Sequence, residues 1–217
     1  MNRNGLSLVE LVVVLAATCL LLAAVPATYD PSVEAARART MKARGRGIWL
    51  AVVTANAERE PLDMPPVWPK EMGLSGTDSS TDYFRRLLSS SPDAPAPVET
   101  PMDRVASDLT LAMLAGVGVP PAASAASLAA SNNAWCVTCV GNDSPPETAF
   151  LFLRNVDAGP VLSAASRVKP AGGPELNLNG RTVWITRGGA CLDARFEMLT
   201  GALLCPTNCP PVTVMRP

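Results

Sequence analysis

Cysteine is the residue type with the widest range of possible chemistry in this chain of 217 residues, which has no histidine. Cys136 and Cys139 have the C-x-x-C spacing of redox and zinc motifs. Cys205 and Cys209 form a second closely spaced pair, and Cys191 lies between the two pairs. The absence of histidine removes the usual general base and the serine-type triad, so we do not expect an enzyme.

These later cysteines allow three interpretations. The favoured one is structural disulfides, Cys136 to Cys139 and Cys205 to Cys209, with a bridge from Cys191 to a member of either pair as the alternative. An odd number of thiols cannot all pair within one chain, so at least one stays free. The second interpretation places a structural zinc ion between both pairs, and the third gives Cys136 an exposed thiol of low pKa for redox chemistry. The favoured interpretation requires neither a metal nor a cofactor.

The other unusual position is Glu10, a carboxylate directly before a long apolar run. Residues 5–10 read Gly-Leu-Ser-Leu-Val-Glu, and Thr18 is the one polar residue between Leu11 and Val25. An acid inside a membrane costs roughly 2.5–3.5 kcal/mol or more, so a partner must offset this cost. In an ordinary secretory signal the charged and apolar stretches both precede the cut, whereas here Gly5 separates a basic leader from the apolar run.

This arrangement resembles the class III signal of type IV pilins and of type II secretion pseudopilins. The resemblance implies that residues 1–5 are a leader peptide, that prepilin peptidase cuts after Gly5, and that Leu6 is then N-methylated. It also implies that Glu10 pairs with the N-terminal amine of a neighbouring subunit. Opposite charges attract strongly in a medium of low dielectric constant, and each is costly there without the other.

The apolar run is long enough to span a bilayer. Residues 6–27 are predicted to form a transmembrane helix, because about 21 residues at about 1.5 Å each cover roughly 31 Å. Cys19 lies in this run and is interpreted as a small packing residue. Residues 28–60 are predicted to form the soluble half of the same long helix, with Ser32 as an N-cap and Pro61 as a stop. We expect its buried face to be a stripe of small residues: Val33, Ala36, Thr40, Ala43, Gly47, Ala51 and Ala55.

The charges around the apolar run do not agree with the membrane orientation that the resemblance implies, which places the C-terminal domain outside the cytoplasm. Arg3 precedes the apolar run, whereas five basic residues follow it: Arg37, Arg39, Lys42, Arg44 and Arg46. A strict positive-inside count would leave the C-terminal domain in the cytoplasm. In the pilin family the leader and its peptidase determine orientation. We therefore expect an inner-membrane protein with a cytoplasmic N-terminus and a periplasmic C-terminal domain.

Residues 61–217 are predicted to form this periplasmic globular domain. A short helix is expected after Ser80 or Thr81, a proline-rich linker at residues 89–101, and a helix within residues 103–131. Strands are expected at residues 148–156, 181–187 and 191–199, the last two joined by a Gly188-Gly189 hairpin turn. The tail from Cys205 to Pro217 has no strand pattern and is expected to be held by its cysteines. The predicted fold is α+β and pilin-like, a long N-terminal helix on an antiparallel sheet of three or four strands.

A structural role is the predicted function, as a subunit of a type II secretion pseudopilus or a type IV pilus-like filament. The expected partners are prepilin peptidase, other pilin or pseudopilin subunits, the assembly platform and the inner membrane. Nucleic acid is not expected as a partner, because the formal net charge is −1 and no basic-aromatic stripe is present. The alternative function is a single-span anchored binding domain with a zinc site formed by Cys136, Cys139, Cys205 and Cys209.

Overall fold

The computed structural model of this chain describes residues 8–92, 104–171, 178, 180–207 and 209–217. It does not describe the side chains of residues 8–10, 16, 17 and 19–32. The chain divides into two units, Met1–Arg37 and Ala38–Pro217, and helix α1 (Leu8–Arg59) contributes to both.

Within the first unit, α1 exposes a run of large apolar side chains. The residues from Leu11 to Leu15 are each between 54% and 60% exposed. The Thr18 hydroxyl donates back to the carbonyl oxygens of Val14 (2.6 Å) and Leu15 (3.0 Å). Ser32 lies inside α1, so its predicted role as an N-cap is wrong. Among the described residues, no helix combines the length and apolarity needed to cross a membrane.

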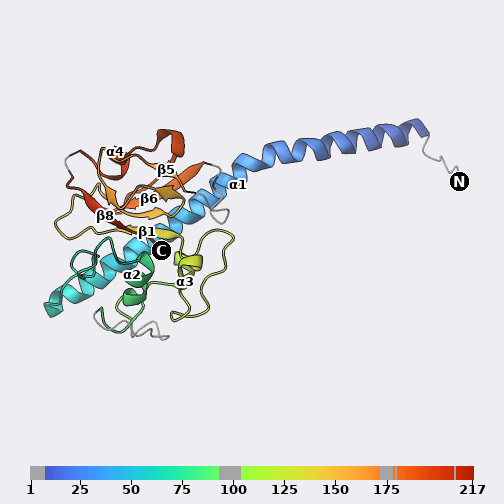
Figure 1. The fold of residues 1–217 in the computed structure, drawn as a ribbon. Coiled ribbons are helices and arrows are strands. Elements are labelled where there is room, and N and C mark those ends of the chain that lie inside the picture. The colour runs from blue at the N-terminus through green and yellow to red at the C-terminus, as the bar shows by residue number, and fades with distance from the viewer. Residues whose placement is uncertain (1–7, 93–103, 172–177, 179, 208) are drawn as a thin grey trace. The chain divides into compact units, whose positions relative to one another are not determined.

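The second unit is built on one antiparallel sheet of six strands in the order β4-β8-β1-β2-β6-β7 (Figure 1). The strands are β1 (Trp135–Thr138), β2 (Ala149–Leu153), β4 (Val161–Leu162), β6 (Arg181–Thr186), β7 (Cys191–Arg195) and β8 (Val212–Met215). A separate pair joins β3 (Val156–Asp157) to β5 (Lys169–Pro170). The predicted α+β class is confirmed, with more strands than expected.

The remaining elements of this unit are short. The helices are α2 (Ser80–Leu87), α3 (Leu111–Leu114) and α4 (Gly201–Leu204), and the 3₁₀ turns are η1 (Glu60–Leu62), η3 (Ala130–Asn132) and η5 (Phe196–Met198). The N-cap of α2 is Ser79, one residue earlier than predicted, and its hydroxyl accepts the Asp82 N–H at 3.0 Å. Pro61 ends α1 as predicted, because the regular helix stops at Arg59 and η1 follows.

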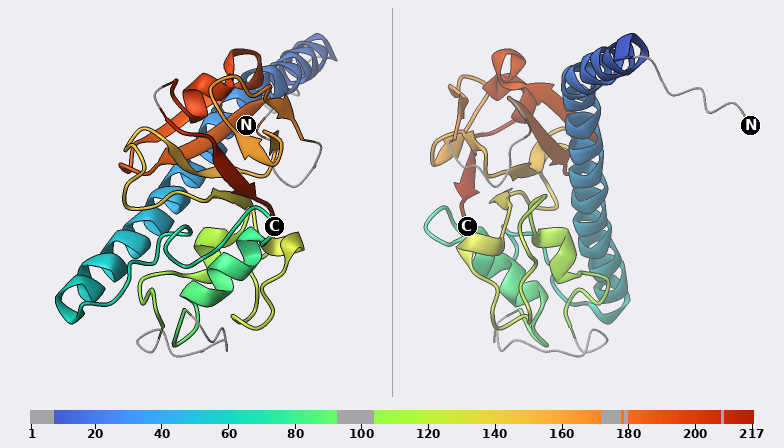
Figure 2. Two further views of the ribbon diagram at one scale, coloured as in Figure 1. Left: turned by 60° about the vertical axis from the view of Figure 1, so that its left-hand side comes forward. Right: turned by 90° about the vertical axis from the view of Figure 1, so that its right-hand side faces the viewer.

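From Ala38 onward, α1 lies along one face of the sheet and beside the segments that carry α2 and α3 (Figure 2). Its buried positions include Ala38, Met41, Gly45, Ile48, Val52 and Ala55. This face differs from the predicted small-residue stripe, since Ala36, Thr40 and Ala43 are exposed and only Ala51 and Ala55 of that stripe are fully buried. The large side chains of Met41, Ile48 and Val52 determine which face of α1 packs on the domain, because burying them removes more apolar area from water than burying alanine does.

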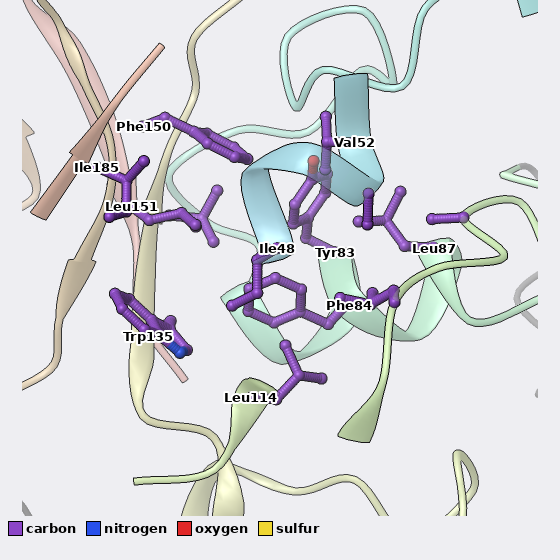
Figure 3. Close-up of a cluster of buried hydrophobic side chains, with 14 of the residues drawn as sticks. Ile48, Val52, Tyr83, Phe84, Leu87, Leu114, Trp135, Phe150, Leu151 and Ile185 are labelled. Carbon is purple, nitrogen blue, oxygen red and sulfur yellow. The ribbon is translucent and has the colours of Figure 1, made fainter. Parts of the chain in front are cut away.

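Two hydrophobic cores lie on opposite faces of the sheet. The first core joins α1 and α2 to the sheet, and Figure 3 shows Ile48 and Val52 among residues of α2, β1, β2 and β6. Its aromatic centre contains Phe150, whose ring meets Trp68 edge-on at 5.1 Å and Tyr83 at 6.3 Å. The second core, on the other face, includes Cys136, Phe152, Trp184, Leu199, Leu204, Cys205, Cys209, Val212 and Val214.

Strand prediction is confirmed for β2, β6, β7 and the hairpin turn, where Gly189 has a φ of +85°. Two other expectations are wrong. The tail contains β8, which pairs with both β1 and β4. The helix expected within residues 103–131 is present as the single-turn α3, and it is short because glycine and proline interrupt the alanine-rich run. Ser89, placed in the linker, is fully buried, and most of the remaining linker lies outside the described residues.

Candidate functional site

The predicted processing and assembly residues lie at the edge of the described structure or beyond it. Gly5 and Leu6 are outside the described residues. Glu10 belongs to α1, but its side chain is not described. Cleavage after Gly5, methylation of Leu6 and pairing of Glu10 therefore stay predictions from the sequence.

The five later cysteines are all free thiols in this structure. Cys136 belongs to the second core, whereas Cys139, three residues further along, packs against the first core. Side chains alternate between faces along a strand, so residues an odd number apart lie on opposite faces. In this structure the two side chains pack against different cores and the predicted Cys136–Cys139 disulfide is not formed, so this pairing stays a prediction.

Cys205 and Cys209 are close together on the second face. Both are buried, and their sulfur atoms lie 3.7 Å and 3.3 Å from the same carbonyl oxygen of Pro210. The Cys209 sulfur is also 2.9 Å from the Thr148 hydroxyl oxygen. Burial, together with a hydrogen bond to Cys209, raises the pKa of Cys205 to about 12. These two thiols are the pair that the structure brings together.

The redox and zinc interpretations of Cys136 do not agree with its surroundings. Cys136 is 2% exposed, and burial raises its thiol pKa to about 12, which is the opposite of an exposed reactive thiolate. The four thiols proposed as zinc ligands do not meet, since Cys139 is on the opposite face from the other three. Within the described parts of the chain, no group of three or more Cys, Asp or Glu side chains could hold a metal ion.

Three of the five basic residues after the apolar run have partners within the second unit. Arg44 donates from Nη1 to the carbonyl oxygens of Ala115 (2.7 Å) and Gly116 (3.1 Å). Arg46 donates to the Gly189 carbonyl at 2.6 Å, and its guanidinium lies over the Trp49 ring. Lys42 forms an ion pair with Asp193 of β7, and Arg181 of β6 joins the same carboxylate at 2.8 Å. These cations attach α1 to loops and to the edge of the sheet.

A cavity of about 560 Å³ lies at the C-terminal end of α1, and we call it the α1-end cavity. Its lining comes from three distant parts of the chain: residues 53–68, Asn142 and Arg187. Two carboxylates, Glu60 and Asp63, belong to this lining and are exposed. Asp63 has a φ of +53°, the left-handed region that Asp and Asn adopt more readily than other side chains. The carbonyl groups of the last turn of α1 lie at the same end of the helix and carry partial negative charge. This side of the cavity is therefore electronegative.

The same cavity contains donors without acceptors. The Asn56 amide oxygen accepts the Val67 N–H at 2.6 Å, which determines the orientation of the amide. Its Nδ2 group, like the Nε of Arg187, is covered and has no hydrogen-bond partner among the described residues. The Arg187 guanidinium lies over the Trp68 ring at 5.7 Å and donates to the Asn142 carbonyl at 2.6 Å. Sequence analysis did not identify this site, because no local motif joins residues so far apart.

Comparison with known proteins finds no matching family model, no similar curated protein and no similar solved structure. The functional conclusions below therefore depend on the residues of this chain and on their geometry.

Proposed function

We propose that this protein is a pilin-like structural subunit that prepilin peptidase processes after Gly5. It would assemble through its N-terminal helix into a type II secretion pseudopilus or a type IV pilus-like filament in the inner membrane. The observation that carries the proposal is the order of a small residue, an acid at Glu10 and an apolar run directly after them.

The exposed apolar part of α1 supports this proposal. Burying a large aliphatic side chain contributes about 1.5–3 kcal/mol, and five consecutive residues from Leu11 to Leu15 are more than half exposed. Such a helix is stabilised by a lipid or protein environment on all sides. The Thr18 hydroxyl suits that environment, since its hydrogen bonds to Val14 and Leu15 are made within the helix.

The attachment of α1 to the second unit also supports a mechanical role. A filament subunit must transmit force from its N-terminal helix to the domain that it carries. Lys42, Arg44 and Arg46 bind the domain at the edge of the sheet and at two loops. These contacts also give three of the five basic residues a role in the folded protein, apart from any effect on membrane orientation.

The first test is N-terminal mass spectrometry of the full chain from membranes, with and without co-expressed prepilin peptidase. The proposal predicts a peptidase-dependent chain that begins at Leu6 and carries one added methyl group. Gly5→Ala should reduce this processing, and Asn4→Ala is the matched control that should not. A chain that still begins at Met1 in the presence of the peptidase would contradict the proposal.

The periplasmic location predicts one disulfide. We propose that Cys205 and Cys209 close in an oxidising compartment by exchange with an oxidant disulfide, which accepts the two electrons and the two thiol protons and leaves as a dithiol. Alkylation before and after reduction, followed by peptide mass spectrometry, would detect this bond. Finding both thiols alkylated without reduction in protein from the periplasmic face would contradict it.

A further inference from the structure

The strand β7 lies at one edge of the six-stranded sheet, and its outer side carries unpaired backbone groups. Thr186 donates its N–H to the Ala190 carbonyl at 2.9 Å, and Phe196 donates to the Gly180 carbonyl at 2.7 Å. In an antiparallel pair every second residue directs its N–H and C=O toward the neighbouring strand, so the odd-numbered residues of β7 direct theirs outward. These outward residues are Cys191, Asp193 and Arg195. Their backbone groups have no hydrogen-bond partner, from backbone or side chain, in the part of the chain that the structure describes.

The opposite edge of the sheet, β4, is protected by the chain itself. This strand has only two residues, and the outward carbonyl of Val161 accepts the Ser166 hydroxyl at 3.2 Å. By contrast β7 has five residues, and its outer backbone groups remain available. A row of unpaired N–H and C=O groups on an edge strand is a template for pairing with another chain. Only an extended polypeptide supplies acceptors and donors at the matching alternation.

The side chains of β7 restrict the sequence of such a polypeptide. On the second face Leu192 is 42% exposed and Ala194 packs against the second core, so a neighbouring strand is expected to be apolar on this side. On the first face Asp193 is already held by two cations. Arg195 is exposed and forms no ion pair with a described residue, so a carboxylate is favoured opposite it.

We propose that β7 binds an extended segment of another polypeptide, which adds a seventh, antiparallel strand to the sheet. The segment carries apolar residues opposite Leu192 and Ala194 and an acidic residue opposite Arg195. Main-chain hydrogen bonds to the three outward residues supply affinity, and the alternation of side chains determines the register. Antiparallel addition is favoured, because it continues the pairing of this sheet and is slightly more stable per residue than parallel addition.

This inference goes beyond the proposed filament function and does not depend on it. The residues of β7 belong to the second unit, and none takes part in the predicted cleavage, methylation or pairing of Glu10. A chain that is never processed could therefore still bind such a segment, and a processed chain could fail to bind it.

Fluorescence anisotropy of labelled peptides tests the proposal on the purified full chain in mild detergent. The probe is Gly-Glu-Val-Thr-Val-Thr-Gly amide, in which Glu lies opposite Arg195 and the first Thr opposite Asp193. An N-methyl group on the first Thr blocks a hydrogen bond to β7, whereas one on the first Val points away from β7. We expect the first change to weaken binding at least about tenfold and the second by less than about threefold. Equal weakening by both, or no binding of the unmodified peptide at about 1 mM, would overturn the proposal.

Variants of the chain then locate the binding site. Arg195 has a φ of −74°, which proline adopts without strain, so Arg195→Pro removes the outward N–H as well as the charge. The matched control is Arg195→Gln, which removes the charge and keeps the N–H. We expect Gln to weaken binding of the unmodified peptide by about threefold and Pro by at least about tenfold. Equal weakening would mean that only the charge contributes and would overturn strand addition. The N-methylated peptides, tested on the unchanged chain, decide the matter if proline disturbs the sheet.

Discussion

The two faces of the sheet are packed in different ways. The first face meets a long helix that is held by cations as well as by apolar side chains, and its core is rich in aromatic rings. The second face is covered by the C-terminal segment that contains η5 and α4, and three of its buried residues are cysteines. The first face is therefore covered by a helix. The second is covered by irregular chain, to which the proposed Cys205–Cys209 disulfide would add a covalent link.

Tryptophan shows the same contrast at two positions. Trp135, on the first face, is fully buried and donates from Nε1 to the Met113 carbonyl at 3.0 Å. Trp184, on the second face, is 3% exposed, and its Nε1 has no partner among the described residues. Of these two indole N–H groups, the one on the first face is therefore satisfied and the one on the second face is not. We expect the first face, which has the larger core, to carry most of the stability of this unit.

Loss of a ring from the first core should have the largest effect. Phe150→Ala removes the contacts with Trp68 and Tyr83 and should lower the free energy of unfolding by about 3–5 kcal/mol. Leu204→Ala, on the second face, should instead open the covering segment locally. Denaturant unfolding of the full chain with hydrogen exchange of the β2 and β6 amides measures both effects. Equal exchange of these amides in the two variants would contradict the contrast between faces.

The two tryptophans provide a smaller and better matched test. Trp135→Phe leaves the Met113 carbonyl without its donor, whereas Trp184→Phe removes an N–H that has no acceptor. Both changes remove similar volume, so Trp135→Phe should cost about 1–2 kcal/mol more in unfolding free energy. Equal losses measured by urea unfolding would show that the hydrogen bond on the first face adds nothing.

Two glycines of α1 test how closely the helix approaches the sheet. A Cβ added at Gly45 would lie 2.7 Å from both Ile185 Cγ1 and Trp135 Cη2, in a packed core. At Gly47 it would lie 2.9 Å from the terminal methyl of Met113, which can move. We expect Gly45→Ala to lower the unfolding free energy by about 1–2 kcal/mol. Gly47→Ala should leave it unchanged or raise it by up to about 1 kcal/mol through helix propensity. A gain in stability for Gly45→Ala would contradict the packing described for the first face.

The buried thiol of Cys136 gives the second face a pH dependence. Its pKa rises from 9 to about 12 on folding, because burial disfavours the thiolate. Above about pH 9 the unfolded chain loses this proton first, so folding stability falls as pH rises toward 12. Between about pH 9.5 and 10.5 this group should account for a loss of about 1 kcal/mol, which Cys136→Ala should abolish. Unfolding curves with identical pH slopes for both proteins would show that Cys136 does not titrate in this way.

Sequence reasoning predicted the regular parts of this fold and missed the parts determined by tertiary contacts. The strands around Phe150 and Trp184 have clear β-branched and aromatic character, and Gly189 marks the turn between β6 and β7. The buried face of α1 was misjudged because small residues occur all around the helix. β8 was missed because Pro210 and Pro211 precede a strand of only four residues.

The candidate sites show the same limit. Cys136 of β1 and Cys139 just beyond it pack against different cores, and predicting this would have required knowing that the segment is a strand. The α1-end cavity joins the end of a helix to Asn142 and Arg187, which are far away in the sequence. No spacing within the chain contains that information. By contrast, the pattern around Gly5 and Glu10 is local, so a processing signal could be predicted there from sequence alone, and it stays a prediction.

The place of β8 has a consequence for the order of folding. Residues 212–215 pair with β1 and β4 from within the sheet, although β1 lies far earlier in the chain. In the strand order of this sheet β4 has β8 as its neighbour, and β1 lies between β8 and β2. Closing so long a loop costs chain entropy before the new contacts stabilise the sheet. We therefore expect β8 to pair late in folding, and until it does the edges of β1 and β4 stay open to pairing with another chain.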